Sequence, residues 1–145
     1  MENTFEIKAI DTASEIQKCL AVALILRPHL NKDTWLITIN EMLKNEKYAL
    51  KGIYDKENIV AFIGYRKMTT LHSGSIIYID DLCTVESYRG KGFGGKLLAH
   101  IRSIAESESM DAVVLDTGFD NHTAQQLYFK NHFELSAVHL HTYLK

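Results

Sequence analysis

The sequence predicts an α/β fold in which a mixed central sheet is flanked by helices. Segments with alternating apolar and polar residues, typical of half-buried strands, are interleaved with segments whose apolar residues recur at helical spacing. One short run, Ala112 to Leu115, is continuously apolar, as in strands buried within a parallel sheet. Together these patterns give most of a β-α-α-β-β-β-α-β-α-β order.

The first helix is framed by two sequence signals. A strand is predicted over Phe5 to Ile10, and Thr12 and Glu15 then form the Thr-x-x-Glu pattern of a capping box. The only proline, Pro28, ends that helix one or two residues before itself, because proline cannot continue a helix. A second helix begins near Asp33, so the two helices are joined by a tight elbow.

Three strands are predicted to follow in sequence. Tyr48 to Tyr54 and Ile59 to Tyr65 are rich in residues that favour strands, and the polar run Asp55 to Asn58 between them indicates a hairpin. A third strand covers about Ser75 to Val85. We therefore expect three consecutive antiparallel strands.

The last third of the chain is predicted to alternate helix and strand. A helix with one apolar face ends near Ser109, and the buried strand of residues 112–115 follows it. Asn121 or Thr123 caps a last helix. Val138 to Leu144 alternates like a terminal strand, which could pair with a second copy of the chain if it lay at a sheet edge.

Composition excludes several classes of protein. With 145 residues, 46% hydrophobic and 23% charged, the chain is expected to form one domain over residues 1–145. A net charge of −2 argues against nucleic-acid binding, and no apolar run is long enough to span a membrane, so a cytoplasmic protein is expected. Two cysteines are expected to be reduced, and seven scattered histidines predict no metal site.

A glycine-rich, basic turn lies between an apolar strand and an amphipathic helix. Four of the six residues in Gly90 to Gly95 are glycine, so the backbone can approach a ligand and direct successive N–H groups at it. A helix N-terminus adds partial positive charge, which favours a phosphate group. The turn also fits a Walker A loop, but Leu97 stands where a hydroxyl should bind magnesium. A dinucleotide fingerprint fits too, but only 50 residues follow Gly95.

A third pattern in the same turn explains more of the sequence. Arg89-x-x-Gly92-x-Gly94 resembles the Q/R-x-x-G-x-G/A signature of the GNAT family of N-acetyltransferases, whose loop binds the pyrophosphate of coenzyme A. A second block is similar to the family's downstream pattern and runs from Leu115-Asp116-Thr117 through Asn121-x-x-Ala124-x-x-Leu127-Tyr128 to Phe133. The resemblance implies the GNAT acyl-CoA N-acyltransferase fold, with acetyl-CoA as the acetyl donor and no metal.

The resemblance also implies which residues contact acetyl-CoA. Asn121 is expected both to cap its helix and to contact the pantetheine arm, and a backbone N–H near Leu82 or Cys83 is the expected donor to the oxyanion. The expected cofactor-binding residues are Leu82, Cys83, Thr84, Arg89, Gly90, Lys91, Gly92, Phe93, Gly94, Gly95, Lys96, Asn121 and Tyr128.

Two catalytic roles follow from the same resemblance. Tyr128 matches the tyrosine that acts as general acid toward the coenzyme A sulfur. Ile77-Tyr78-Ile79-Asp80-Asp81 resembles the Tyr-Leu-Glu-Asp stretch of diamine acetyltransferases, which makes Asp80 the expected base. Asp116 competes for that role, because the branch that acetylates peptide N-termini carries a glutamate at the matching point. Alternation along the strand would put Asp80 and Asp81 on opposite faces.

The resemblance implies that the acceptor is a primary amine, and we expect it to be part of a small cationic molecule. The elbow between the first two helices overhangs the acceptor site in a GNAT fold, so the expected substrate-binding residues are Arg27, His29, Tyr78 and Asp80. The cationic preference rests on a cluster of acidic residues, namely Asp80, Asp81, Asp116 and Asp120. Two alternatives remain open: a peptide or protein amine acetylated through Asp116, and a non-catalytic module that senses acetyl-CoA.

His132 stands where the family usually has glycine, just before the phenylalanine matched by Phe133. This departure predicts a helix end that adopts positive φ without glycine.

Overall fold

The computed structural model describes residues 5–145. The described chain divides into two compact units, one reaching to Leu115 and the other covering Asp116–Lys145, and each is described by itself. The prediction of a single domain over residues 1–145 therefore stays a prediction.

The first unit is built on a five-stranded sheet in the order β1-β2-β3-β4-β5. Its strands are β1 (Phe5–Ala9), β2 (Tyr48–Asp55), β3 (Asn58–Thr70), β4 (Gly74–Thr84) and β5 (Ala112–Leu115). The first four strands pair antiparallel, and β5 pairs parallel to β4. The mixed sheet and the three consecutive antiparallel strands are thus confirmed, although β3 runs five residues beyond the predicted Tyr65.

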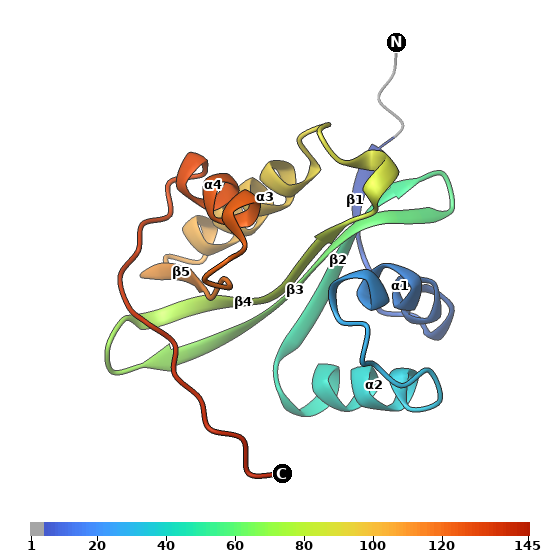
Figure 1. The fold of residues 1–145 in the computed structure, drawn as a ribbon, viewed down its shortest axis with the longest axis horizontal. Helices are drawn as coiled ribbons and strands as arrows, with labels where there is room; N and C mark the ends of the chain where they lie inside the picture. Colours follow the sequence, from blue (N-terminus) through green and yellow to red (C-terminus); the bar gives the residue numbers. More distant parts are fainter. Residues whose placement is uncertain (1–4) are drawn as a thin grey trace. The chain divides into compact units, whose positions relative to one another are not determined.

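Three helices cover this sheet. Helices α1 (Ala13–Leu26) and α2 (Trp35–Asn45) lie on one face, and α3 (Phe93–Ser107) lies on the other (Figure 1). A single 3-10 turn, η1 (Glu86–Tyr88), joins β4 to the glycine-rich turn. Each helix buries one apolar side against the sheet, so the unit has a core on both faces.

The α1–α2 pair forms as its sequence signals predict. The Thr12 side chain accepts a hydrogen bond from the Glu15 backbone N–H while the Glu15 side chain accepts from the N–H of Thr12, completing the capping box. Arg27 caps the C-terminus of α1 immediately before Pro28. The buried Trp35 donates a 2.7 Å hydrogen bond from Nε1 to the carbonyl of Ile16, which ties α2 to α1.

The core under the helix pair is continuous. Its buried members are Ile10, Ile16, Cys19, Val22, Ala23, Trp35, Ile39, Tyr48, Leu50, Tyr54, Ile59, Phe62 and Cys83. On the opposite face α3 buries Phe93, Leu97, Leu98, Ile101 and Ala105. Both cysteines are buried thiols, in agreement with the expected reduced state.

The second unit contains α4 (His122–Lys130). Asn121 caps this helix, since its side chain accepts a 3.2 Å hydrogen bond from the N–H of Ala124. Just beyond the helix His132 has a φ of 74°, so the predicted left-handed residue without glycine is confirmed.

The terminal strand predicted over Val138 to Leu144 is wrong. These residues carry no regular secondary structure, and the large apolar side chains of Val138, Leu140, Tyr143 and Leu144 are exposed. Alternation of apolar residues shows which side chains could share a face, but a strand also needs a partner strand to pair with. Among the described residues no helix is long and apolar enough to cross a membrane.

Candidate active site

Strand β4 loses its second neighbour halfway along its length. Its pairing with β5 ends at Ile79 and Leu115, and residues 80–84 pair with β3 alone. Within the described residues, Leu82 to Thr84 therefore have no strand partner on the β5 side of the sheet. This open edge carries three of the predicted cofactor-binding residues, Leu82, Cys83 and Thr84, and follows Asp80 and Asp81 directly.

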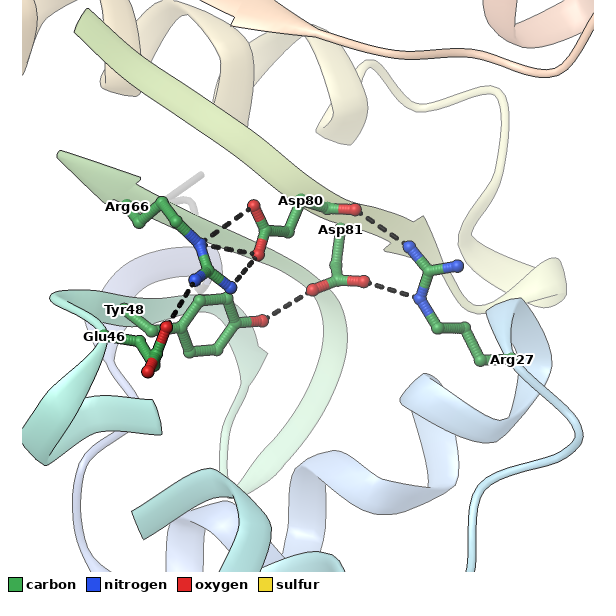
Figure 2. A network of polar contacts seen from close by, with 6 residues as sticks. All are labelled: Arg27, Glu46, Tyr48, Arg66, Asp80 and Asp81. Carbon is green, nitrogen blue, oxygen red and sulfur yellow. Dashed lines mark hydrogen bonds and ion pairs between the residues drawn. The ribbon is translucent and has the colours of Figure 1, made fainter. Parts of the chain in front are cut away.

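A β-bulge turns both acidic residues to the same face. Asp81 lies opposite Gly64 and Ile79 lies opposite Tyr65, so Asp80 is an extra residue in β4. A bulge locally breaks side-chain alternation and re-aims side chains. The expectation that Asp80 and Asp81 point to opposite faces is wrong for this reason, and Figure 2 shows their carboxylates side by side in one polar network.

Asp81 is held by two donors from distant parts of the chain. The Tyr48 hydroxyl donates a 2.6 Å hydrogen bond to Oδ2, and Nε of Arg27 donates one of 2.7 Å to Oδ1. Arg27 Nη2 also donates to the backbone carbonyl of Asp80 at 2.9 Å (Figure 2). Arg27 thus bridges the end of α1 to the bulge.

Asp80 forms a second ion pair, with Arg66 of β3. Nε and Nη2 of Arg66 both donate to its carboxylate, and Nη1 lies 3.5 Å from Oε1 of Glu46. Burial raises the pKa of Asp80, and the hydrogen bonds and charge of Arg66 partly oppose that rise. The pKa of Arg66 is raised in turn, chiefly by its hydrogen bonds to Asp80.

The absence of a side chain at residue 64 makes room for this network. A Cβ added at Gly64 would overlap the hydroxyl of Tyr48 and lie 3.0 Å from Oδ2 of Asp81. Burial, and then the charge of Asp81, raises the pKa of Tyr48 well above its usual value, so its hydroxyl stays a donor over the neutral range. The Tyr48 ring also lies 5.5 Å from the guanidinium of Arg66.

The sequence analysis missed three members of this network: Glu46, Tyr48 and Arg66. Nothing local marks them, because their partners lie at least 14 positions away in the chain. The network also changes how the acidic residues are interpreted, since Asp80 and Asp81 are each paired with a guanidinium. The expected acidic surface at this point is therefore largely neutralised.

The glycine turn has the backbone of an anion site. Gly90 and Gly92 have φ values of 80° and 83°, and an added Cβ at either would meet nothing within 4 Å. Glycine is thus required there for conformation rather than for space. Gly92 is the N-cap of α3, and its carbonyl accepts the first helical hydrogen bond, from Lys96 N. The N–H groups of residues 93–95 have no acceptor within the helix.

The side chains of the turn fix its position. Phe93 is buried and stacks on Tyr88 with ring centroids 6.1 Å apart, so only its backbone faces outward. Arg89 Nε donates to the carbonyl of Thr84 at 3.1 Å, and Lys96 Nζ donates to that of Phe5 at 3.3 Å. Lys91 lies over the Tyr88 ring. The backbone N–H groups at the start of α3 are thus donors that the turn can offer to a phosphate.

The remaining predicted site residues of the first unit, Tyr78, His29 and Cys83, lie in different surroundings. Tyr78 lies opposite Arg66 in the β3–β4 register, on the face that carries Asp80. His29 is exposed in the segment between α1 and α2. Burial raises the pKa of Cys83, which disfavours a thiolate nucleophile.

Tyr128, Asn121 and Asp116 belong to the second unit. Burial raises the pKa of Tyr128, whose ring packs edge-on against Phe133. Asp116 accepts from Nδ1 of His139 at 2.9 Å, a contact with a carboxylate that the sequence analysis did not foresee for this histidine. No three potential metal ligands gather anywhere in the described residues.

Comparison with known proteins gives this architecture a class. A Trypanosoma brucei acetyltransferase of known structure superimposes with a TM-score of 0.81 at 21% identity, covering 97% of this chain and 99% of the other. An aminoglycoside N-acetyltransferase in complex with coenzyme A gives 0.84 at 15% identity, covering 100% and 97%. At these identities the likeness shows the fold, which is that of the acetyltransferases.

Sequence comparison makes the assignment specific. Residues 13–133 match the model of the Acetyltransferase (GNAT) family, and the chain belongs to this family. It is 26% identical over 122 residues to an uncharacterized N-acetyltransferase of Bacillus subtilis, covering 84% of this chain and 86% of that protein. A D-amino-acid N-acetyltransferase of Saccharomyces cerevisiae is 35% identical over 71 residues, covering 49% and 44%. The protein is accordingly an acyltransferase enzyme of the N-acetyltransferase type.

Proposed function

We propose that this enzyme transfers an acetyl group from acetyl-CoA to the primary amine of a small molecule. The observation that carries the proposal is the open edge of β4, with the glycine turn at the N-terminus of α3 following it and the two carboxylates at the bulge preceding it. One strand end thereby offers both an anion site and a group that can accept a proton. Acetyl-CoA fits this donor set, because backbone N–H groups at a helix N-terminus suit a pyrophosphate.

Asp80 is the proposed base. The amine nitrogen attacks the thioester carbonyl, a C–N bond forms, the C–S bond breaks, and the ammonium proton passes to Asp80 directly or through one water. Burial raises the pKa of Asp80 and so makes it a better proton acceptor, and the hydrogen bonds and charge of Arg66 partly oppose that rise. A backbone N–H near Leu82 or Cys83, where β4 lacks its β5 neighbour, is proposed to bind the developing oxyanion.

Tyr128 is the proposed acid toward the departing thiolate. The raised pKa of Tyr128 keeps its proton at neutral pH, as a general acid requires. Asn121 is proposed to contact the pantetheine arm in addition to capping α4. These two roles rest on the family resemblance of the block from Asn121 to Tyr128.

The test is release of coenzyme A thiol from acetyl-CoA, scanned over amino acids, polyamines, aminoglycosides and short peptides. Turnover should occur with one class of small amine, and Asp80→Asn and Tyr128→Phe should each reduce kcat by about 100-fold. Asp116→Asn is the matched control for Asp80→Asn and should retain activity. Full loss in Asp116→Asn with activity retained in Asp80→Asn would overturn the assignment of the base and favour a peptide amine as acceptor.

A further inference from the structure

The guanidinium of Arg27 uses only one of its edges within the protein. The N–H of Nε and one N–H of Nη2 lie in the guanidinium plane along one of its edges, and both are taken, by Asp81 Oδ1 and the Asp80 carbonyl. Figure 2 draws the third nitrogen, Nη1, without a partner among the residues shown and pointing away from the aspartates. Because the side chain is 44% exposed, this outer end is open to a ligand.

Arg66 provides a comparison inside the same network. It also anchors its Nε and Nη2 edge on an aspartate, in this case Asp80. Its Nη1, however, faces the carboxylate of Glu46 at 3.5 Å. Within the described residues Arg27 pairs with no carboxylate other than Asp81, so its outer nitrogen has no protein carboxylate like the one that Glu46 brings to Arg66.

The accessible charge at this end of the network is positive. The side chains of Asp80 and Asp81 are only 17% and 15% exposed, and each is already paired with a guanidinium. A positively charged ligand would compete with Arg27 and Arg66 for these two carboxylates. An anionic ligand avoids this competition, because it can approach the outer end of Arg27 directly.

We propose that Arg27 binds a carboxylate of the acceptor, so that the preferred acceptor is an amine that also carries a carboxylate, such as an amino acid. This inference rests on the proposed function, since it names the acceptor class for the same site. Planar guanidinium groups match carboxylates through two parallel hydrogen bonds, and such charge-assisted bonds are stronger than neutral ones. Arg27, anchored through one edge, is held ready for this contact.

The test compares acceptors that differ only in the carboxylate. Phenylalanine, phenylalanine amide and phenethylamine form one series, and lysine, lysine amide and cadaverine form another. For the wild-type enzyme kcat/KM should be at least about tenfold higher for the amino acid than for its amide or decarboxylated amine. This preference should appear mainly in KM.

Variants of Arg27 test whether this residue causes the preference. Arg27→Gln should reduce the ratio between carboxylated and decarboxylated acceptors to about one, whatever its effect on overall activity. Arg27→Lys keeps the charge but loses the two parallel N–H groups of the guanidinium, so it should keep only part of the preference for carboxylated acceptors. Arg102→Gln, at an exposed arginine of α3 paired with Glu106, is the control and should keep both activity and ratio.

Three outcomes would overturn the inference. Equal or better use of the decarboxylated amines by the wild type is the first. The second is a ratio that survives in Arg27→Gln, and the third is an Arg27→Gln defect confined to the KM for acetyl-CoA, which would assign the guanidinium to a coenzyme phosphate.

Failure of the proposed reaction is distinguished by a binding measurement. Each ligand of the two series is tested for raising the unfolding temperature of wild type and Arg27→Gln in the presence of coenzyme A. If no amine is acetylated but the amino acids alone stabilise the wild type and not Arg27→Gln, the proposed reaction is wrong and carboxylate binding stands. If no amine is acetylated and the amino acids stabilise neither the wild type nor Arg27→Gln, both proposals are wrong.

Discussion

The hydroxyl of Tyr48 and the carboxylate of Asp81 form a 2.6 Å hydrogen bond that joins β2 to the bulge of β4 across the intervening strand β3. Tyr48 is buried, and the pKa of its hydroxyl is raised well above the usual value. The bond therefore persists over the whole neutral range and holds Asp81 beside Asp80.

Tyr48→Phe removes that donor and leaves Oδ2 of Asp81 poorly satisfied in a place where water has little access. The free energy of unfolding should fall by about 1–3 kcal/mol, measured by urea denaturation. Tyr65→Phe is the matched control: Tyr65 is equally buried, and its hydroxyl makes no hydrogen bond within the described part of the chain. A similar loss in both variants would mean that the bond to Asp81 contributes nothing specific.

Gly64→Ala should destabilise the protein by about 1–3 kcal/mol, because the new methyl group overlaps the Tyr48 hydroxyl and crowds Asp81. Gly52→Ala is the comparison: its Cβ would lie 2.8 Å from Cδ1 of the buried Ile10, a milder overlap than the one at Gly64, so its cost should be smaller. In a Tyr48→Ala background the cost of Gly64→Ala should shrink. Additive costs in urea denaturation would contradict the predicted overlap.

Arg66→Gln should move the acid limb of the pH profile of kcat/KM to higher pH. Arg66 opposes the rise in the pKa of Asp80, so its removal raises that pKa further and the base is protonated at a higher pH. Lys67→Gln, which breaks the exposed ion pair with Glu108, serves as control and should leave the limb in place. An unmoved limb in Arg66→Gln would argue against Asp80 as the base.

The free energy of unfolding should depend on pH through His100. Its Nε2 is buried and has no hydrogen-bond partner within the described residues, and burial, aided by the charge of Lys51, lowers its pKa. The folded state thus binds this proton less readily than the unfolded state, so the histidine costs stability as pH falls below its unfolded pKa of about 6.5.

His100→Leu removes this titration. As the pH is lowered from about 7.5 to about 5.5, the wild type should lose more stability than His100→Leu. The difference between their free energies of unfolding, measured by urea denaturation at each pH, should therefore grow. Lys51→Gln should weaken the pH dependence of the wild type, because it removes one cause of the lowered pKa. A difference that stays constant with pH would show that His100 does not titrate differently on folding.

Much of the fold could be predicted because its signals are local. Thr12 and Glu15 mark a helix start within four residues, and Pro28 marks the end of the same helix. Asn121 likewise marks the start of α4 as its N-cap. The polar residues between β2 and β3 form the expected turn, where Lys56 has a φ of 59°. In each case short-range geometry decides the structure, and distant parts of the chain add little.

Only part of the candidate site could be predicted, because its contacts join residues that are far apart in the sequence. Its acidic residues could be named from the resemblance, but their partners lie far away: Arg27 is 54 positions from Asp81, and Tyr48 is 33. The bulge at Asp80 depends on how β3 and β4 pair, which alternation within one strand does not reveal. The missing terminal strand beyond Val138 has the same origin, because strand formation requires a neighbour.

The α1–α2 pair contributes one charge from each of its helix ends, Arg27 after α1 and Glu46 after α2, whereas Tyr48, Arg66 and the two aspartates come from the sheet. Both helix-end groups lie at the exposed rim of the network, with side chains 44% and 55% exposed. If Arg27 binds the acceptor as proposed, substitutions at these two helix ends would change the charge presented to an acceptor while the sheet residues of the network stay unchanged.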